Sequence, residues 1–190
     1  MKKALISAMK PLTVVFACLT SACLGPAHDI QAINGFDAQR YLGKWYEIAR
    51  LPHSFEKGLV AVTADYRLNT DGTLQVVNRG YNAEKMKWSE AVGVARLSEN
   101  PTQGKLKVSF FRPFYADYRV IALDGDYRWA MVTTNRYNYL WILSRSPKMD
   151  HALLERLISQ ARDLGFDTVS LIEVDQSLNL TPGAAASGTD

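Results

Sequence analysis

Apolar and polar residues alternate with a period of two along most of this chain. Residues 60–68 show the pattern most clearly, because the side chains of one parity are apolar and most of those of the other parity are polar. Such alternation indicates strands with one buried face. Seven further segments are predicted as strands on the same grounds: residues 44–50, 73–81, 87–97, 105–111, 117–123, 127–134 and 139–145.

One segment has helical spacing instead. In residues 149–164, apolar side chains recur at steps of three and four, which indicates an amphipathic helix. Asp150 is placed to cap the start of this helix, and Gly165 is placed to end it. Residues 169–174 then predict a last short strand.

The predicted order of elements favours an all-β fold: an eight-stranded antiparallel up-and-down β-barrel, with one C-terminal α-helix packed outside and a short ninth strand. The links are short, and Asn69-Thr70-Asp71-Gly72 is typical of a hairpin turn. A sandwich fits the same strand number, but closure is favoured because it removes exposed edges. A barrel of eight strands holds either packed side chains or one small ligand.

The first 22 residues have the features of an export signal. Three lysines precede the short apolar run of residues 12–19, and small residues lead to Cys23. This order resembles the lipobox of bacterial lipoproteins, in which the cysteine is acylated and becomes the new N-terminus. Leu24, which is not Asp, implies export to the outer membrane by the same resemblance. The alternative is an ordinary secretory signal cut after Ala22 or Ala27.

These observations predict four segments. Residues 1–22 are a lipoprotein signal peptide, residues 23–34 a lipidated N-terminus and tether, residues 35–176 the barrel with its helix, and residues 177–190 a disordered tail. Three of the 22 basic residues lie in the signal, which leaves 19 basic and 19 acidic residues in the mature chain. A neutral body argues against nucleic acid as a partner.

Three short motifs carry a resemblance to a known family. Residues 43–46 (GKWY) resemble the G-x-W motif of lipocalins, residues 116–118 (ADY) resemble their second motif, and Arg145 matches the arginine of their third. The resemblance implies that Gly43, Trp45, Tyr46, Asp117 and Arg145 maintain the fold, with Arg145 packed over the Trp45 ring. Wider stretches such as residues 45–50 and 139–145 resemble the bacterial outer-membrane lipoprotein branch, the Blc type.

The expected ligand site is the inside of the barrel. Small residues at Ala64, Ala91 and Gly93 indicate unfilled space there, although the same side chains would also suit a dry core. Resemblance to the family implies a fatty acid or a lysophospholipid as the ligand. The predicted lining consists of apolar positions on one parity: Val62, Ala64, Tyr66, Val76, Val108, Phe110, Tyr118 and Val120.

Three residues permit two interpretations each. Glu47 shares the parity of Trp45, so it either points into the barrel, where it orients a ligand or pairs with a basic residue, or lies at the rim. Trp129 and Trp141 are on the parity expected to be exposed, where they would pack under the helix or form a dimer face, but the sequence leaves open which face Trp141 occupies.

The leading hypothesis is a non-enzymatic lipid-binding lipoprotein without a cofactor. It would be anchored to the outer membrane by acyl chains on Cys23, face the periplasm, and store or transport lipids for envelope maintenance. A homodimer stays open. The alternatives are an envelope structural lipoprotein without a ligand and a lipid-modifying enzyme, but the three histidines (His28, His53 and His151) have no metal-ligand spacing and no nucleophile motif is present.

Overall fold

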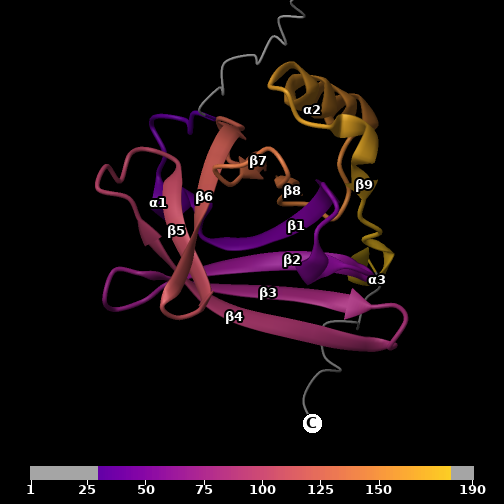
Figure 1. Ribbon diagram of the computed structural model, residues 1–190, viewed down its shortest axis with the longest axis horizontal. Helices are drawn as coiled ribbons and strands as arrows, with labels where there is room; N and C mark the ends of the chain where they lie inside the picture. The colour runs from indigo at the N-terminus through magenta and orange to yellow at the C-terminus, as the bar shows by residue number, and fades with distance from the viewer. Residues whose placement is uncertain (1–29, 181–190) are drawn as a thin grey trace, which may run out of the picture.

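The computed structural model describes residues 30–180, whose strands form one antiparallel sheet closed into a barrel. The sheet order is β2-β3-β4-β5-β6-β7-β8-β1-β9, and β1 also pairs with β2, which closes the ring (Figure 1). The strands are β1 (Gly43–Arg50), β2 (Leu59–Leu68), β3 (Leu74–Asn82), β4 (Lys87–Leu97), β5 (Lys105–Phe111), β6 (Phe114–Leu123), β7 (Trp129–Thr133), β8 (Leu140–Ser144) and β9 (Ile172–Glu173).

The predicted fold class is confirmed, but most strand bounds differ from the prediction by one to three residues, and β6 begins at Phe114 and not at Asp117. β7 starts at Trp129 because Tyr127 has a φ of 61° and belongs to the turn that follows Asp124. β9 has only two residues because Thr168–Ser170 forms a 3-10 turn, η2, in place of the predicted start of the strand.

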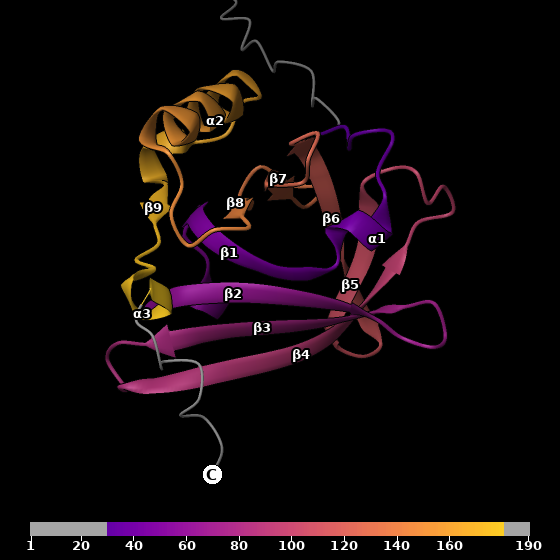
Figure 2. The same cartoon turned by 180° about the vertical axis from the view of Figure 1, so that it is seen from behind.

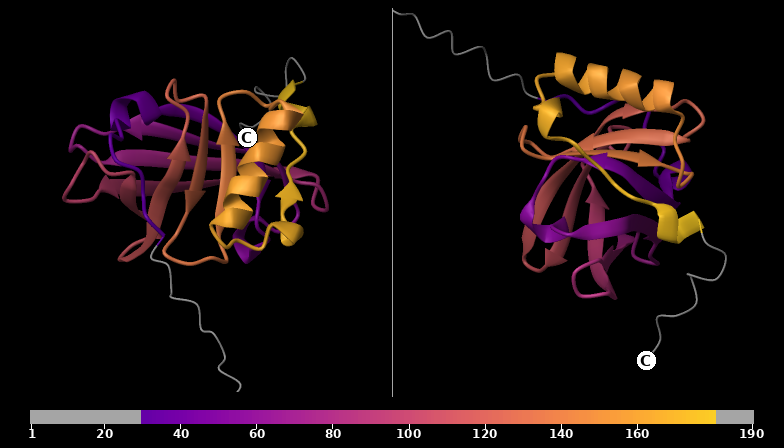
Figure 3. Two further views of the ribbon diagram at one scale, coloured as in Figure 1. Left: turned by 90° about the horizontal axis from the view of Figure 1, so that it is seen from above. Right: turned by 90° about the vertical axis from the view of Figure 1, so that its right-hand side faces the viewer.

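The helix α2 (His151–Asp163) lies across the outside of the sheet, as predicted (Figure 3). The Asp150 side chain accepts a hydrogen bond from the Leu153 amide and caps the first turn. Leu154, Leu157 and Ala161 form the buried stripe of α2. They pack in one cluster with outward-facing residues of β1, β7 and β8, namely Ala49, Met131, Leu140 and Ile142.

A second cluster fills one end of the barrel interior. It contains Tyr41, Trp45, Tyr66, Val76 and Val120, which are all buried. The short helix α1 (Ala38–Tyr41) closes this end, opposite the β3–β4 turn when the molecule is viewed from behind (Figure 2). We call this the closed end and the opposite one the mouth. In an up-and-down barrel the β1–β2, β3–β4, β5–β6 and β7–β8 connections all lie at the mouth.

Two of the predicted segment boundaries differ from the structure. Residues 30–34, assigned to the tether, lie against the barrel: Ile30 is buried, and the Ile33 amide donates to the Val120 carbonyl. Ser177–Leu180, assigned to the disordered tail, forms the short helix α3, which contacts β2. The predicted signal peptide, Cys23 and residues 181–190 lie outside the described residues.

No helix within residues 30–180 is long and apolar enough to cross a membrane.

Candidate functional site

The strand register identifies which side chains face the inside of the barrel. Ala64 of β2 lies beside the buried Trp45 of β1 and beside Asn78 of β3, and Asn78 lies beside Ala91 of β4. Val108 of β5 continues this inward parity, because its neighbour on β4, Ala95, belongs to the inner core. Glu47 also faces inward, two residues beyond Trp45 on β1.

The eight predicted lining residues fall into two groups. Tyr66, Val76 and Val120 are buried in the cluster at the closed end, and Val62 is buried beside β3. The other four border that cluster and retain accessible surface: Ala64, Val108, Phe110 and Tyr118. Inward-facing Ala91 and Ala116 are exposed. The closed end is therefore a packed core, and the space that solvent reaches lies in the half of the barrel towards the mouth.

The prediction of empty space at Gly93 is wrong. A Cβ atom at this position would lie 2.8 Å from the Phe110 ring, so that ring already occupies the space beside Gly93. Glycine is required there because a larger residue would displace Phe110. Ala64 and Ala91 are the small residues that leave accessible surface inside the barrel.

Three tyrosine hydroxyls meet at the boundary between the packed core and this space. Tyr66 donates to the Tyr118 oxygen at 2.9 Å, and the Tyr118 and Tyr41 oxygens are 2.7 Å apart. Burial raises the pKa of Tyr66 to about 12 and raises the pKa values of Tyr41 and Tyr118 well above their ordinary range. The three phenols are therefore neutral hydrogen-bonding groups at physiological pH.

A buried ion pair lies on the inner wall near the mouth. Arg50 donates to the Glu47 carboxylate at 2.6 Å, and both side chains are nearly inaccessible to solvent. Burial raises the pKa of the Glu47 carboxyl well above its ordinary value, with a further contribution from Glu56. Of the interpretations of Glu47, the structure therefore shows the one in which it points inward and pairs with a basic residue.

The remaining hydrogen bonds of Arg50 secure the β1–β2 connection. Its Nη2 atom donates to the carbonyls of Glu56 and Leu59, at 2.9 and 3.1 Å. The Glu56 carboxylate accepts a hydrogen bond from the Trp141 indole at 3.2 Å and lies 3.0 Å from His53 Nε2. Trp141, whose face the sequence left open, packs with the inner cluster, whereas Trp129 packs under α2.

Three of the motif residues, Gly43, Trp45 and Arg145, lie at the closed end. The Arg145 guanidinium lies 3.8 Å from the centre of the Trp45 ring and donates to the carbonyls of Lys44, Arg40 and Tyr127. Gly43 has a φ of 89°, a conformation that suits glycine, and brings the backbone close to Arg145. Tyr46 packs in the cluster beneath α2, and Asp117 forms ion pairs with Lys107 and Arg119 on the outside.

Asn78 is a residue of the inner wall that the sequence analysis did not select. Its Oδ1 atom is buried and has no hydrogen-bond partner among residues 30–180. The residues beside it on both neighbouring strands are alanines, Ala64 and Ala91, so no long side chain covers it from those positions. A polar residue that follows Leu74 and Val76 on the inward parity of β3 is the signal that could have identified it.

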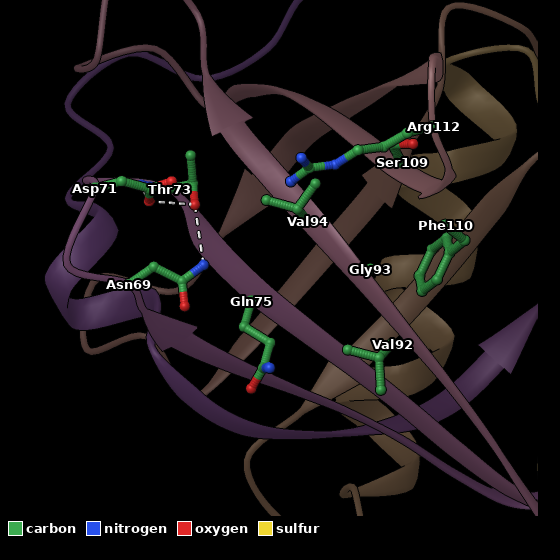
Figure 4. A pocket seen from close by; sticks show the side chains of 10 residues that line it. All are labelled: Asn69, Asp71, Thr73, Gln75, Val92, Gly93, Val94, Ser109, Phe110 and Arg112. Carbon is green, nitrogen blue, oxygen red and sulfur yellow. Dashed lines mark hydrogen bonds between the residues drawn. The ribbon is translucent and has the colours of Figure 1, made fainter.

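A separate groove of about 290 Å³ lies on the outer face of β3, β4 and β5 (Figure 4). Gln75, Val94 and Ser109 line it, and their parity is opposite to that of the inner core. Gly93 and Phe110 also line it, so the groove opens on the outer face and reaches the wall beside the Phe110 ring. Within residues 30–180, no group of three or more His, Cys, Asp or Glu side chains is placed to hold a metal ion.

The comparisons with known proteins agree with this architecture. The profile of the lipocalin-like domain matches residues 36–176. The chain belongs to the lipocalin family. Among the relatives of this lipocalin is the outer membrane lipoprotein Blc of Vibrio cholerae, 46% identical over 164 residues, which cover 86% of this chain and 96% of the relative. The outer membrane lipoprotein Blc of Escherichia coli K12 is 45% identical over 172 residues, with 90% and 96% covered.

Solved structures show the same fold at low sequence identity. Insecticyanin from the tobacco hornworm Manduca sexta matches with a TM-score of 0.63 and 20% identity, over 77% of this lipocalin and 84% of that chain. The cockroach allergen Per a 4 matches with a TM-score of 0.64 and 20% identity, over 79% and 94%. At such identities the likeness shows the fold alone.

Proposed function

We propose that this lipocalin binds a fatty acid or a lysophospholipid in the mouth half of its barrel, for storage or transport in maintenance of the bacterial envelope. It acts as a binding protein and not as an enzyme. Acyl chains on Cys23 anchor it to the outer membrane, with the barrel facing the periplasm. The relatives named outer membrane lipoprotein Blc support this location.

The observation that carries the proposal is accessible apolar surface inside a closed barrel. Ala64, Val108 and Phe110 face inward and yet keep surface that a small molecule can contact. An acyl chain placed against them would bury that surface, and each methylene contributes about 0.8 kcal/mol. The alternative, an envelope lipoprotein without a ligand, leaves this surface unexplained.

The polar groups of the inner wall suit a ligand with a polar head near the mouth. The Asn78 Oδ1 atom is an unpartnered acceptor, so it would gain a hydrogen bond from a ligand hydroxyl or ammonium group. Arg50 does not supply a free cation for a head group, because its side chain is buried and its charge is paired with Glu47 and Glu56. These features favour a lysophospholipid, which has hydrogen-bond donors, over a fatty acid carboxylate.

Native mass spectrometry of the chain from residue 24, purified without added lipid, tests the proposal. We expect a bound lipid at about one per barrel, and Val108→Trp should remove it by filling the inner space. Val92→Trp is the matched control, because Val92 is exposed on the outer face of β4. The proposal would be overturned if the wild-type barrel were empty and did not bind added lysophospholipid. Equal lipid content in the two tryptophan variants would also overturn it.

A further inference from the structure

Large apolar side chains are exposed on the connections at the mouth. Phe111 is 81% exposed and Phe114 is 77% exposed at the tip of the β5–β6 hairpin. Met86, in the β3–β4 turn, is 78% exposed, and Phe55, in the β1–β2 connection, is 67% exposed. Three separate mouth connections thus present apolar side chains to solvent, although one side of the Phe55 ring packs on His53 and Tyr139. Exposed apolar groups gathered at one end of a protein mark a contact surface.

The charges of the connections between consecutive barrel strands differ at the two ends. The mouth connections carry four exposed cations, Lys57, Lys85, Arg112 and Arg136, against one exposed carboxylate, Glu84. The closed-end connections carry three exposed carboxylates, Asp71, Glu99 and Asp126, against Arg128. The α1 segment and the start of β1 add Asp37 against Arg40 and Lys44, so the exposed charges of the closed end sum to one net negative charge, against three net positive charges at the mouth connections. A chain whose mature part is formally neutral is therefore polarised along the barrel axis, which orients it in the field of an anionic surface.

We infer that the mouth end docks onto the surface of an anionic phospholipid bilayer. Phe55, Met86, Phe111 and Phe114 enter the boundary between head groups and acyl chains, and the four cations contact anionic head groups. This combination of apolar tips and nearby Lys or Arg is the one that interfacial membrane contact requires. Docking in this orientation would open the barrel towards the lipid, so a single-chain lipid would enter without crossing water. The inference rests on the proposed function and adds the surface from which the ligand is taken.

Flotation with vesicles tests the contact without the lipid anchor. The chain from residue 24 lacks Cys23 but keeps every described residue, and the barrel closes within residues 30–180. We expect it to float with vesicles of phosphatidylethanolamine and phosphatidylglycerol, and at least tenfold less with phosphatidylcholine vesicles. The Phe111→Ser/Phe114→Ser variant should lower the partition coefficient for the anionic vesicles at least tenfold. Arg112→Glu should lower the same coefficient several-fold. Leu68→Ser, an exposed apolar position beside the β2–β3 turn at the closed end, should change nothing.

Site-specific labels report which end meets the bilayer. The chain from residue 24 has no cysteine, so Met86→Cys and Asp71→Cys each provide a single site for an environment-sensitive dye. We expect a blue shift on adding anionic vesicles at the mouth position and none at the closed-end position. Equal shifts at both positions, or a shift only at position 71, would overturn the inference.

Three further outcomes separate this inference from others. If wild-type protein does not float but still holds lysophospholipid in native mass spectra, docking is refuted and the proposed function stands. If wild-type protein floats but holds no lipid in native mass spectra, docking is supported and the ligand site is what failed. If the double serine variant changes the oligomeric state in light scattering but floats like the wild type, the mouth contacts a second copy and the inference is overturned.

Discussion

The Gln176 side chain joins two strands where the barrel would otherwise open: its Nε2 atom donates to the Glu47 carbonyl at 2.7 Å and to the Val62 carbonyl at 2.9 Å. Only residues Gly43–Tyr46 of β1 pair with β2. Beyond Tyr46, the backbone carbonyls of the two strands do not accept hydrogen bonds from each other's amides. The adjacent Asp175 carbonyl accepts a hydrogen bond from the Ala61 amide. The C-terminal segment thus completes the barrel wall near the mouth.

Gln176→Ala should lower the free energy of unfolding by about 2–3 kcal/mol, because two buried carbonyls lose their donor. Urea denaturation measures the change. Gln160→Ala, at an exposed position on α2, should change stability by less than about 0.5 kcal/mol. Equal midpoints for the two variants would show that the seam does not depend on this amide.

Arg145→Lys should destabilise the barrel by about 2–3 kcal/mol, although it keeps the charge. A lysine offers a single ammonium, whereas the planar guanidinium covers the Trp45 ring and donates to three separate carbonyls. Thermal unfolding measures the loss. Arg128→Lys is the control, because Arg128 is exposed, and its salt bridges to Asp124 and Asp126 lie at the surface. A smaller loss at position 145 than at position 128 would contradict this role.

Tyr118→Phe should cost more stability than Tyr66→Phe, by about 1–2 kcal/mol. The Tyr118 oxygen contacts both other hydroxyls, so its removal leaves Tyr41 and Tyr66 without their partner. Tyr66→Phe removes one hydrogen bond and leaves the Tyr41–Tyr118 pair in place. Chemical denaturation of both variants decides the order, and a larger loss for Tyr66→Phe would refute Tyr118 as the central group.

Stability should fall as pH decreases from about 4 towards 2, and Asp124 should contribute to that fall. Hydrogen bonds from Arg128 lower the pKa of the Asp124 carboxyl to about 2, from 3.8 in an ordinary environment. The unfolded chain therefore binds this proton first as pH falls, and the stabilisation present above pH 4 is lost through this window. Melting temperatures of Asp124→Asn should depend less on pH here than those of the wild type.

Asp126→Asn provides the control for this pH dependence. Its carboxylate lies 3.8 Å from the Arg128 guanidinium and is largely exposed. The variant should keep the wild-type slope of melting temperature against pH. If the slope were flattened in Asp126→Asn and unchanged in Asp124→Asn, the prediction would be wrong, because Asp126 and not Asp124 would cause the pH dependence.

Local patterns in the sequence were sufficient for most of the fold. Alternation located the eight barrel strands, because each has one face towards the interior and one towards solvent or the helix. The three- and four-residue spacing located α2, and Asp150 and Gly165 marked its ends. Ala64, Val108 and Phe110 border the inner core, as their parity indicates, but parity alone did not separate the packed end from the accessible one, and their contact with a ligand stays a prediction.

Tertiary structure decided what alternation leaves ambiguous. β8 is apolar on both faces, because α2 covers the outer one, so its pattern could not show that Trp141 points inward and Ile142 outward. The Phe110 ring fills the space beside Gly93 from a neighbouring strand, which no local pattern records. Gln176 closes a seam between strands more than 100 residues earlier. Local spacing determines which residues share a face, but only the closed barrel determines what each face meets.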